Sequence, residues 1–101
     1  MIIQSRDDQT LEVKGILELD ASNAGRVRDD IRAAITPAHT ALEIDFSAIT
    51  FLDSSGLGAL IALHKTLRSQ NGTLRLVNPT PSANQIIELT RLHRVFEIVT
   101  R

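Results

Sequence analysis

The sequence contains the stretch Phe51-Leu52-Asp53-Ser54-Ser55-Gly56-Leu57-Gly58-Ala59-Leu60, which passes from an apolar segment through small polar residues into an apolar run. From residue 55 or 56 to Arg68, apolar residues keep helical spacing, and Asn71-Gly72 is a typical helix-ending signal. Asp53 or Ser54 is the natural N-cap, because a short side-chain oxygen can accept a hydrogen bond from a first-turn amide. The stretch therefore predicts a strand-to-helix turn that presents hydroxyl groups.

The remaining segments alternate between strand and helix patterns. Strand patterns occupy Ile2–Arg6, Thr10–Lys14, Ile16–Asp20, Ala41–Phe46 and Thr73–Asn78, helical patterns occupy Ala24–Ile35 and Ala83–Leu92, and Val95–Val99 fits either a strand or a helical turn. Asp20 or Ser22 can cap the first helix. This order predicts a single α/β domain over residues 1–101, with a mixed central sheet of four to five strands and three to four helices.

Composition excludes several classes of function. The chain has eleven basic and twelve acidic residues, so it has no strong electrostatic field that would attract nucleic acid or a membrane surface. The chain has no cysteine, its three histidines lack metal-ligand spacing, and its only aromatic residues are three phenylalanines. No apolar run approaches the roughly 20 residues that span a bilayer, and the N-terminus does not resemble a secretory signal. We therefore expect a cytoplasmic protein without metal or cofactor.

The residues from Asp53 to Gly58 have two possible interpretations. They can be a plain helix cap followed by glycines that allow close packing, which is the commoner situation. Alternatively, because Gly56 and Gly58 each lower helix propensity by about 0.8–1 kcal/mol relative to alanine, they can mark the close approach of another chain. The residues alone leave both interpretations open.

The same ten residues, Phe51–Leu60, closely resemble the signature of STAS domains of the bacterial anti-sigma factor antagonist type. The resemblance extends to Leu42–Ser47 before the signature, and to Leu74–Pro79 and Leu92–Ile98 after it, so it spans nearly the whole chain. It implies the STAS fold.

The resemblance also implies a switch. In that family an anti-sigma factor with serine kinase activity phosphorylates the second serine of Asp-Ser-Ser-Gly, whereas the unmodified antagonist binds the anti-sigma factor and frees the sigma factor. By this correspondence Ser55 is the phosphorylation site, and the partner is an anti-sigma factor serine/threonine kinase. The expected partner-binding residues are Asp20, Asp53, Ser54, Ser55, Gly56 and Leu57.

One part of the sequence departs from the family pattern. Members usually have Gly-x-Leu-Asp at the end of the second strand, whereas here Gly15 is followed by Ile16-Leu17-Glu18-Leu19-Asp20. Either Glu18 or Asp20 therefore occupies the acidic position. We favour Asp20, because the residues that follow it match the family's usual entry into the first helix.

The sequence offers no support for catalysis. Position 53 is Asp where the Gly-x-Ser-x-Gly turn of hydrolases requires glycine, and His64 lies more than two helical turns beyond Ser55. No phosphate-binding or dinucleotide glycine motif is present. The alternative to an anti-sigma factor antagonist is a STAS subunit that binds a transporter ATPase or another signalling assembly. In either case we expect a monomer or weak dimer.

Overall fold

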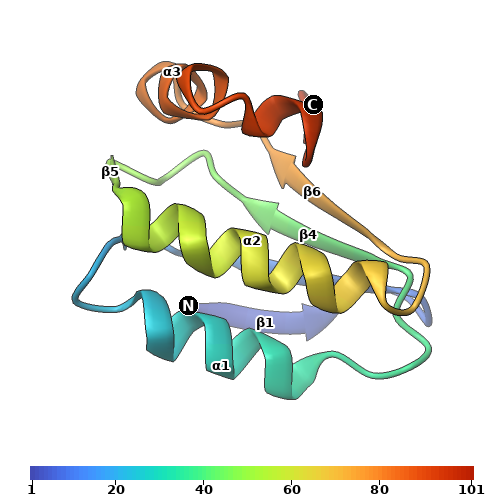
Figure 1. The fold of residues 1–101 in the computed structure, drawn as a ribbon. Helices are drawn as coiled ribbons and strands as arrows, with labels where there is room; N and C mark the ends of the chain where they lie inside the picture. The colour runs from blue at the N-terminus through green and yellow to red at the C-terminus, as the bar shows by residue number, and fades with distance from the viewer.

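The computed structural model describes all 101 residues, in an arrangement of short strands and three α-helices. The elements in chain order are β1 (Ile2–Ser5), β2 (Thr10–Lys14), β3 (Glu18–Leu19), α1 (Ala24–Ala34), β4 (Ala41–Asp45), β5 (Phe51–Leu52), α2 (Ser54–Arg68), β6 (Thr73–Val77), α3 (Pro81–Leu89), the 3-10 helix η1 (Leu92–Arg94) and β7 (Glu97–Val99). The prediction of an α/β fold with a mixed sheet and three to four helices is confirmed (Figure 1).

The main sheet has five strands in the order β1-β2-β4-β6-β7. β1 and β2 form the expected antiparallel hairpin, whereas β2, β4, β6 and β7 run parallel. The tail, left open between strand and helical turn, contains η1 and then the edge strand β7. The pattern over Ile16–Asp20 yields only the two-residue strand β3, which pairs in parallel with β5 in a separate small sheet.

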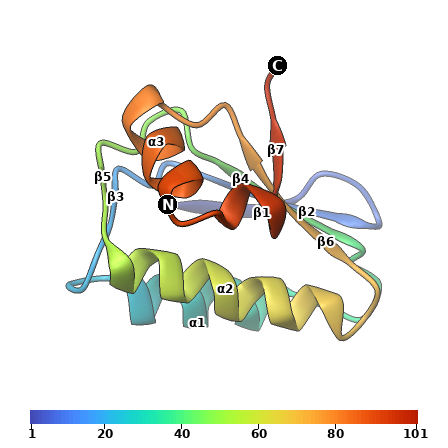
Figure 2. The same ribbon diagram turned by 45° about the horizontal axis from the view of Figure 1, so that its top comes forward.

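The sheet has two unlike faces. α1 and α2 lie side by side over one face, where alternate apolar residues of the strands join a core of twenty buried side chains (Figures 1 and 2). Residues of the opposite parity lie on the other face, which we call the charged face. Strand register aligns Glu12, Glu43, Arg75 and Glu97 across it.

Glu43 occupies the centre of the charged face and is only 1% exposed. Its carboxylate accepts hydrogen bonds from Arg6 (Nη1 to Oε1, 2.7 Å), Arg75 (Nη1 to Oε2, 3.2 Å) and Arg101 (Nη1 to Oε1, 2.9 Å; Nη2 to Oε2, 2.8 Å). The hydrogen bonds from Arg101 are the largest cause of a lowered pKa at Glu43. This network ties strands β4 and β6 to the two ends of the chain.

The helix ends differ in part from the sequence predictions. The N-cap of α2 is Asp53, one of the two expected residues. The N-cap of α1 is Asn23, so the prediction of Asp20 or Ser22 was wrong, because both residues belong to a turn that precedes the helix. The third helix begins at Pro81, where Thr80 caps it, and ends at Leu89 rather than Leu92. No helix has the length and apolar character that crossing a membrane requires.

Candidate functional site

Asp53 organises the start of α2 with both of its carboxylate oxygens. Oδ1 accepts a hydrogen bond from the backbone amide of Gly56 at 3.0 Å, which caps the helix. Oδ2 accepts one from the amide of Ala21 at 3.1 Å, in the loop between β3 and α1. One side chain therefore joins two loops that are 32 residues apart in the sequence.

The joined loop has its own internal supports. The Asp20 carboxylate accepts hydrogen bonds from the hydroxyl and the amide of Ser22, and these bonds lower the pKa of Asp20. The Asn23 carboxamide accepts from the Asp20 amide at 2.9 Å and donates to the Glu18 carbonyl oxygen at 2.7 Å. Because its side chain is used in this way, Asn23 gives α1 no side-chain cap. Of the two acidic candidates, Asp20 lies in the loop that Asp53 holds.

Ser54 and Ser55 form the first turn of α2 and are exposed. Neither hydroxyl makes a hydrogen bond to another group of the chain, although other hydroxyls of the protein do, such as those of Ser22 and Ser69. The first amides of a helix lack intrahelical acceptors and carry the positive end of the helix dipole. The site thus presents free hydroxyls beside a positive helix end.

Gly56 and Leu57, by contrast, face inward. A Cβ atom on Gly56 would overlap the carbonyl oxygen of Leu19 and approach Leu52 Cδ1 to 2.9 Å, so glycine permits the close contact between α2 and β3. Leu57 is a member of the core cluster. Both side-chain positions are therefore enclosed by the protein itself. Gly58 is exposed, with open space around it.

His64 lies further along α2 than the two serines. His64 points its ring at Phe96, with 5.8 Å between the ring centroids, and burial is the main cause of its lowered pKa. Its Nδ1 atom is buried without a hydrogen-bond partner. The structure thus places this histidine in packing against the C-terminal segment. No group of three or more acidic or histidine side chains is arranged to hold a metal ion.

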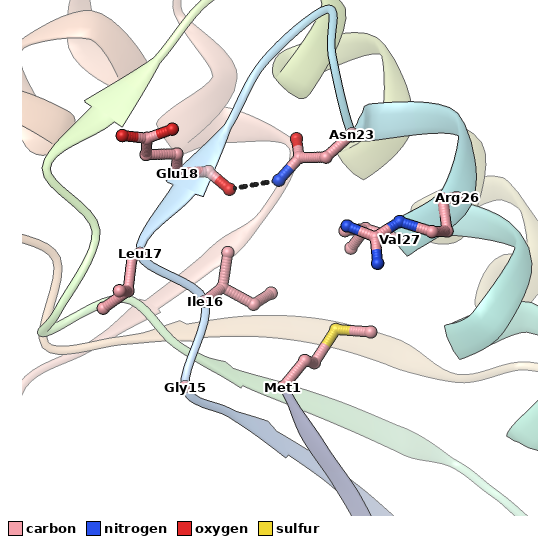
Figure 3. A pocket seen from close by; sticks show the side chains of 8 residues that line it. All are labelled: Met1, Gly15, Ile16, Leu17, Glu18, Asn23, Arg26 and Val27. Atoms are coloured by element: carbon pink, nitrogen blue, oxygen red, sulfur yellow. Dashed lines mark hydrogen bonds between the residues drawn. The ribbon is translucent and has the colours of Figure 1, made fainter.

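Sequence reasoning missed the pairing of β3 with β5, which brings Glu18 opposite Phe51. Phe51 is 54% exposed, beside the two serines. Sequence reasoning also missed a groove at the other side of the Asp20 loop, lined by Leu17 and Arg26 among others (Figure 3). A signal for the groove was available in the run Ile16-Leu17-Glu18-Leu19. The run contains three apolar residues, whereas the strand β3 within it has only two residues, one of which is buried.

Comparison with known proteins gives consistent matches over nearly the whole chain. A family model described as the STAS domain matches residues 3–101. An anti-sigma-B factor antagonist of Listeria monocytogenes is 27% identical over 96 residues, which cover 95% of this chain and 84% of the relative. A STAS-domain containing protein of Pseudomonas aeruginosa is 30% identical over 98 residues, which cover 95% of this chain and 94% of the relative.

Among solved structures, the anti-sigma factor antagonist SpoIIAA of Bacillus is similar to this chain in two states. Its unphosphorylated form superposes with a TM-score of 0.84 at 25% identity, covering 99% of this chain and 88% of that one. Its phosphorylated form superposes with a TM-score of 0.72 at the same identity, covering 99% and 91%.

Proposed function

Because this chain belongs to the STAS domain family, we propose that it is an anti-sigma factor antagonist controlled by phosphorylation of Ser55. In its unphosphorylated form it binds an anti-sigma factor that is also a serine kinase, and the bound sigma factor is released. The names of the curated relatives support the antagonist role, and the phosphorylated form of SpoIIAA supports the modification. The protein acts in the cytoplasm as a binding module without catalytic activity.

The observation that carries this proposal is the free, exposed hydroxyl of Ser55 in the first turn of α2. A kinase needs a hydroxyl that is accessible and not engaged elsewhere, and Ser55 meets both requirements. Asp53 holds the surrounding backbone without consuming that hydroxyl, because its oxygens accept from Gly56 and Ala21.

A phosphate on Ser55 would change the surface without breaking the fold. It adds about −1.5 to −2 charges, and the positive end of α2 stabilises such a charge by roughly 0.3–1 kcal/mol at an exposed site. The carboxylate of Asp53 opposes part of this gain. A partner surface shaped for a small neutral hydroxyl would have to desolvate the new dianion, and a conflict of about 1.4 kcal/mol already lowers affinity tenfold.

The partner surface consists of the exposed and half-buried residues on both sides of Asp53. We assign direct contact to Asp20, Asp53, Ser54 and Ser55, whereas Gly56 and Leu57 support the surface from inside. Gly58 extends this surface by one helical turn, and the open space around it allows the backbone of another chain to approach.

The test is capture of the partner followed by a phosphorylation assay. The protein, as a monomer or weak dimer, is used to capture an anti-sigma factor kinase from an extract of its own bacterium, and affinity is then measured with the purified kinase. Incubation with ATP and mass spectrometry should place one phosphate on Ser55. Ser55→Ala should keep the affinity, Ser55→Asp should lose it by more than about tenfold, and the matched control Ser54→Asp should lose less.

Two results would contradict the proposal. One is the absence of phosphate on Ser55 together with unchanged binding by Ser55→Asp. The other is capture of a transporter ATPase or an unrelated signalling protein in place of an anti-sigma factor, which would favour the accessory-subunit alternative.

A further inference from the structure

A groove of about 380 Å³ lies between the start of α1 and the segment that connects β2 to β3 (Figure 3). It is lined by Met1, Gly15, Ile16, Leu17, Glu18, Asn23, Arg26 and Val27. Gly15 has a φ angle of +80°, a left-handed conformation that turns the chain away from β2 at the edge of the groove. The groove therefore depends on a specific backbone turn as well as on side chains.

The groove combines an apolar floor with one exposed apolar side chain at its rim. Ile16 and Val27 are buried beneath it and belong to the core. Met1 is 48% exposed at its rim, whereas the side chain of Leu17, 63% exposed, lies on the opposite side of the segment from Ile16 (Figure 3). An apolar floor beside an exposed methionine favours occupation by another apolar group, which would remove this surface from water.

An unpaired guanidinium group stands over this apolar hollow. The guanidinium of Arg26 extends from α1 toward the groove (Figure 3), and it forms no ion pair or side-chain hydrogen bond within the chain. Its neighbour Arg28 pairs with Asp29 at 2.9 Å. The carboxylate of Glu18 points to the far side of β3 (Figure 3), so it does not neutralise Arg26. A carboxylate is the natural complement, because a guanidinium can bind it with two parallel hydrogen bonds.

The groove and the Ser55 site are two sides of one loop. Asn23 lines the groove and also holds the Asp20 amide and the Glu18 carbonyl group. The same loop is bound to Asp53 through the Ala21 amide. A protein that covers Ser54 and Ser55 and extends across the Asp20 loop therefore reaches the groove.

We propose that this groove receives an apolar side chain of the anti-sigma factor, with a neighbouring carboxylate of that protein paired to Arg26. This assignment rests on the proposed function and adds a second anchor to the surface around Ser55. A buried apolar anchor beside an arginine is typical of the few residues that dominate protein–protein affinity. The groove anchors the partner, while Ser55 determines whether the partner stays bound.

The test measures affinity for the kinase captured above, using Arg26→Gln and the charge reversal Arg26→Glu. Each variant should weaken binding by about tenfold or more, as expected for an anchor residue. Arg32→Gln is the matched control, because it removes the same charge from an exposed position of α1, and it should change affinity by less than about twofold. Arg26→Gln should also reduce the salt dependence of binding. The melting temperature and circular dichroism verify that each variant is folded.

The outcomes separate the two proposals. If the wild type binds the kinase and loses it on Ser55 phosphorylation, but Arg26→Gln and Arg26→Glu bind as the wild type does, the groove assignment is wrong and the proposed function stands. Equal losses from Arg26→Gln and Arg32→Gln would also overturn it, because they would indicate a general effect of charge. If the wild type binds no anti-sigma factor, both the proposed function and the groove assignment are wrong.

Discussion

The start of α2 and the charged face each depend on one carboxylate, but the two carboxylates have opposite surroundings. Glu43 on the charged face is enclosed by three guanidinium groups, so every charge near it has a partner. Asp53 accepts only two backbone amides and leaves the hydroxyls of Ser54 and Ser55 free. At Glu43 the charged groups pair with one another and stabilise the fold. At Asp53 the carboxylate holds a loop, and the neighbouring hydroxyl groups remain free to bind a partner.

This difference shows how a small domain can separate stability from binding. Modification or occupation of the α2 start can change what the protein binds without touching the network at Glu43. This contrast predicts that substitutions of tightly packed or buried paired residues strongly lower the free energy of unfolding. Substitutions of the exposed serines should change it little.

The largest effect is expected for Gly56→Ala. The new Cβ atom would overlap the backbone carbonyl oxygen of Leu19, which cannot move without disturbing the β3–β5 pair. Overpacking typically costs about 1–3 kcal/mol, and we expect roughly 3 kcal/mol or more here because the obstacle is backbone. Urea denaturation with circular dichroism would measure the loss.

Gly58→Ala is the matched control, two residues further along the same helix. Its position is exposed, with no atom within 4 Å of the new Cβ, so alanine should stabilise the protein by about 0.5–1 kcal/mol. Equal effects of the two substitutions would contradict the close contact between α2 and β3.

Glu43→Gln should have the next largest effect. It removes the negative charge that three arginines share and leaves their donors incompletely paired, so we expect about 2 kcal/mol of destabilisation. Glu12→Gln, on the adjacent strand of the same face, is the control and should cost less, because its ion pair with Lys14 is more exposed. A Glu43→Gln variant as stable as the wild type would show that the network contributes nothing net.

Stability should fall with acid in two steps. Because the pKa of His64 is lowered in the folded protein, its contribution to the free energy of unfolding is complete above pH 6.5, the ordinary value, and is lost as the pH falls through the folded value. The pKa of Glu43 is also lowered, so its contribution is complete above the ordinary value of 4.5 and is lost at lower pH. Thermal melts from pH 8 to 3 would resolve them. Glu43→Gln should reduce the second step and keep the first, and His64→Gln should do the reverse.

Asp53→Ala should cost about 1 kcal/mol, because it removes the cap of α2 and the bond to Ala21 together. Asp53→Asn retains an oxygen for one of these bonds and should lose less. Hydrogen exchange should show faster opening at Gly56 and Ala21 in the alanine variant, while the amides of β4 keep their protection. Unchanged exchange at Ala21 would mean that Asp53 does not join the two loops.

The smallest effect on stability is expected for Ser55→Asp. The added charge is favoured by the helix end and opposed by Asp53, so the free energy of unfolding should stay within about 0.5 kcal/mol of the wild type. Urea denaturation would measure it. A much lower stability would mean that a negative charge at Ser55 acts by disturbing the fold, and would contradict release through conflict at the interface.

Much of the fold could be predicted from local patterns. The β1–β2 hairpin, the strands β4 and β6, and the apolar spacing of α1 and α2 follow from periods of two and 3.6 residues, which a single sequence displays. The N-cap at Asp53 was one of two candidates, because capping requires a short side-chain oxygen directly before the helix.

The error in the cap of α1 arose where several good capping residues lie close together. Asp20 and Ser22 are good capping residues, but the turn that they form with each other lies before α1, and Asn23 takes the N-cap position. Spacing alone does not show which residue is the cap, because Asp20, Ser22 and Asn23 all carry a short polar side chain that can accept a hydrogen bond. Leu57 keeps the apolar spacing of α2, and its side chain lies in the core.

The sequence by itself determined which residues carry the candidate chemistry, because the Asp-Ser-Ser-Gly stretch is a local feature and a helix start exposes whatever occupies its first turn. Only the tertiary structure decided what surrounds that stretch. The pairing of β3 with β5 brings the loop that follows β3 beside Asp53 and so creates the joined loops. The groove beneath Arg26 forms where the segment from Gly15 to Glu18 meets the start of α1. The physical reason is that parallel pairing joins segments more than thirty residues apart, and no local pattern encodes such a contact.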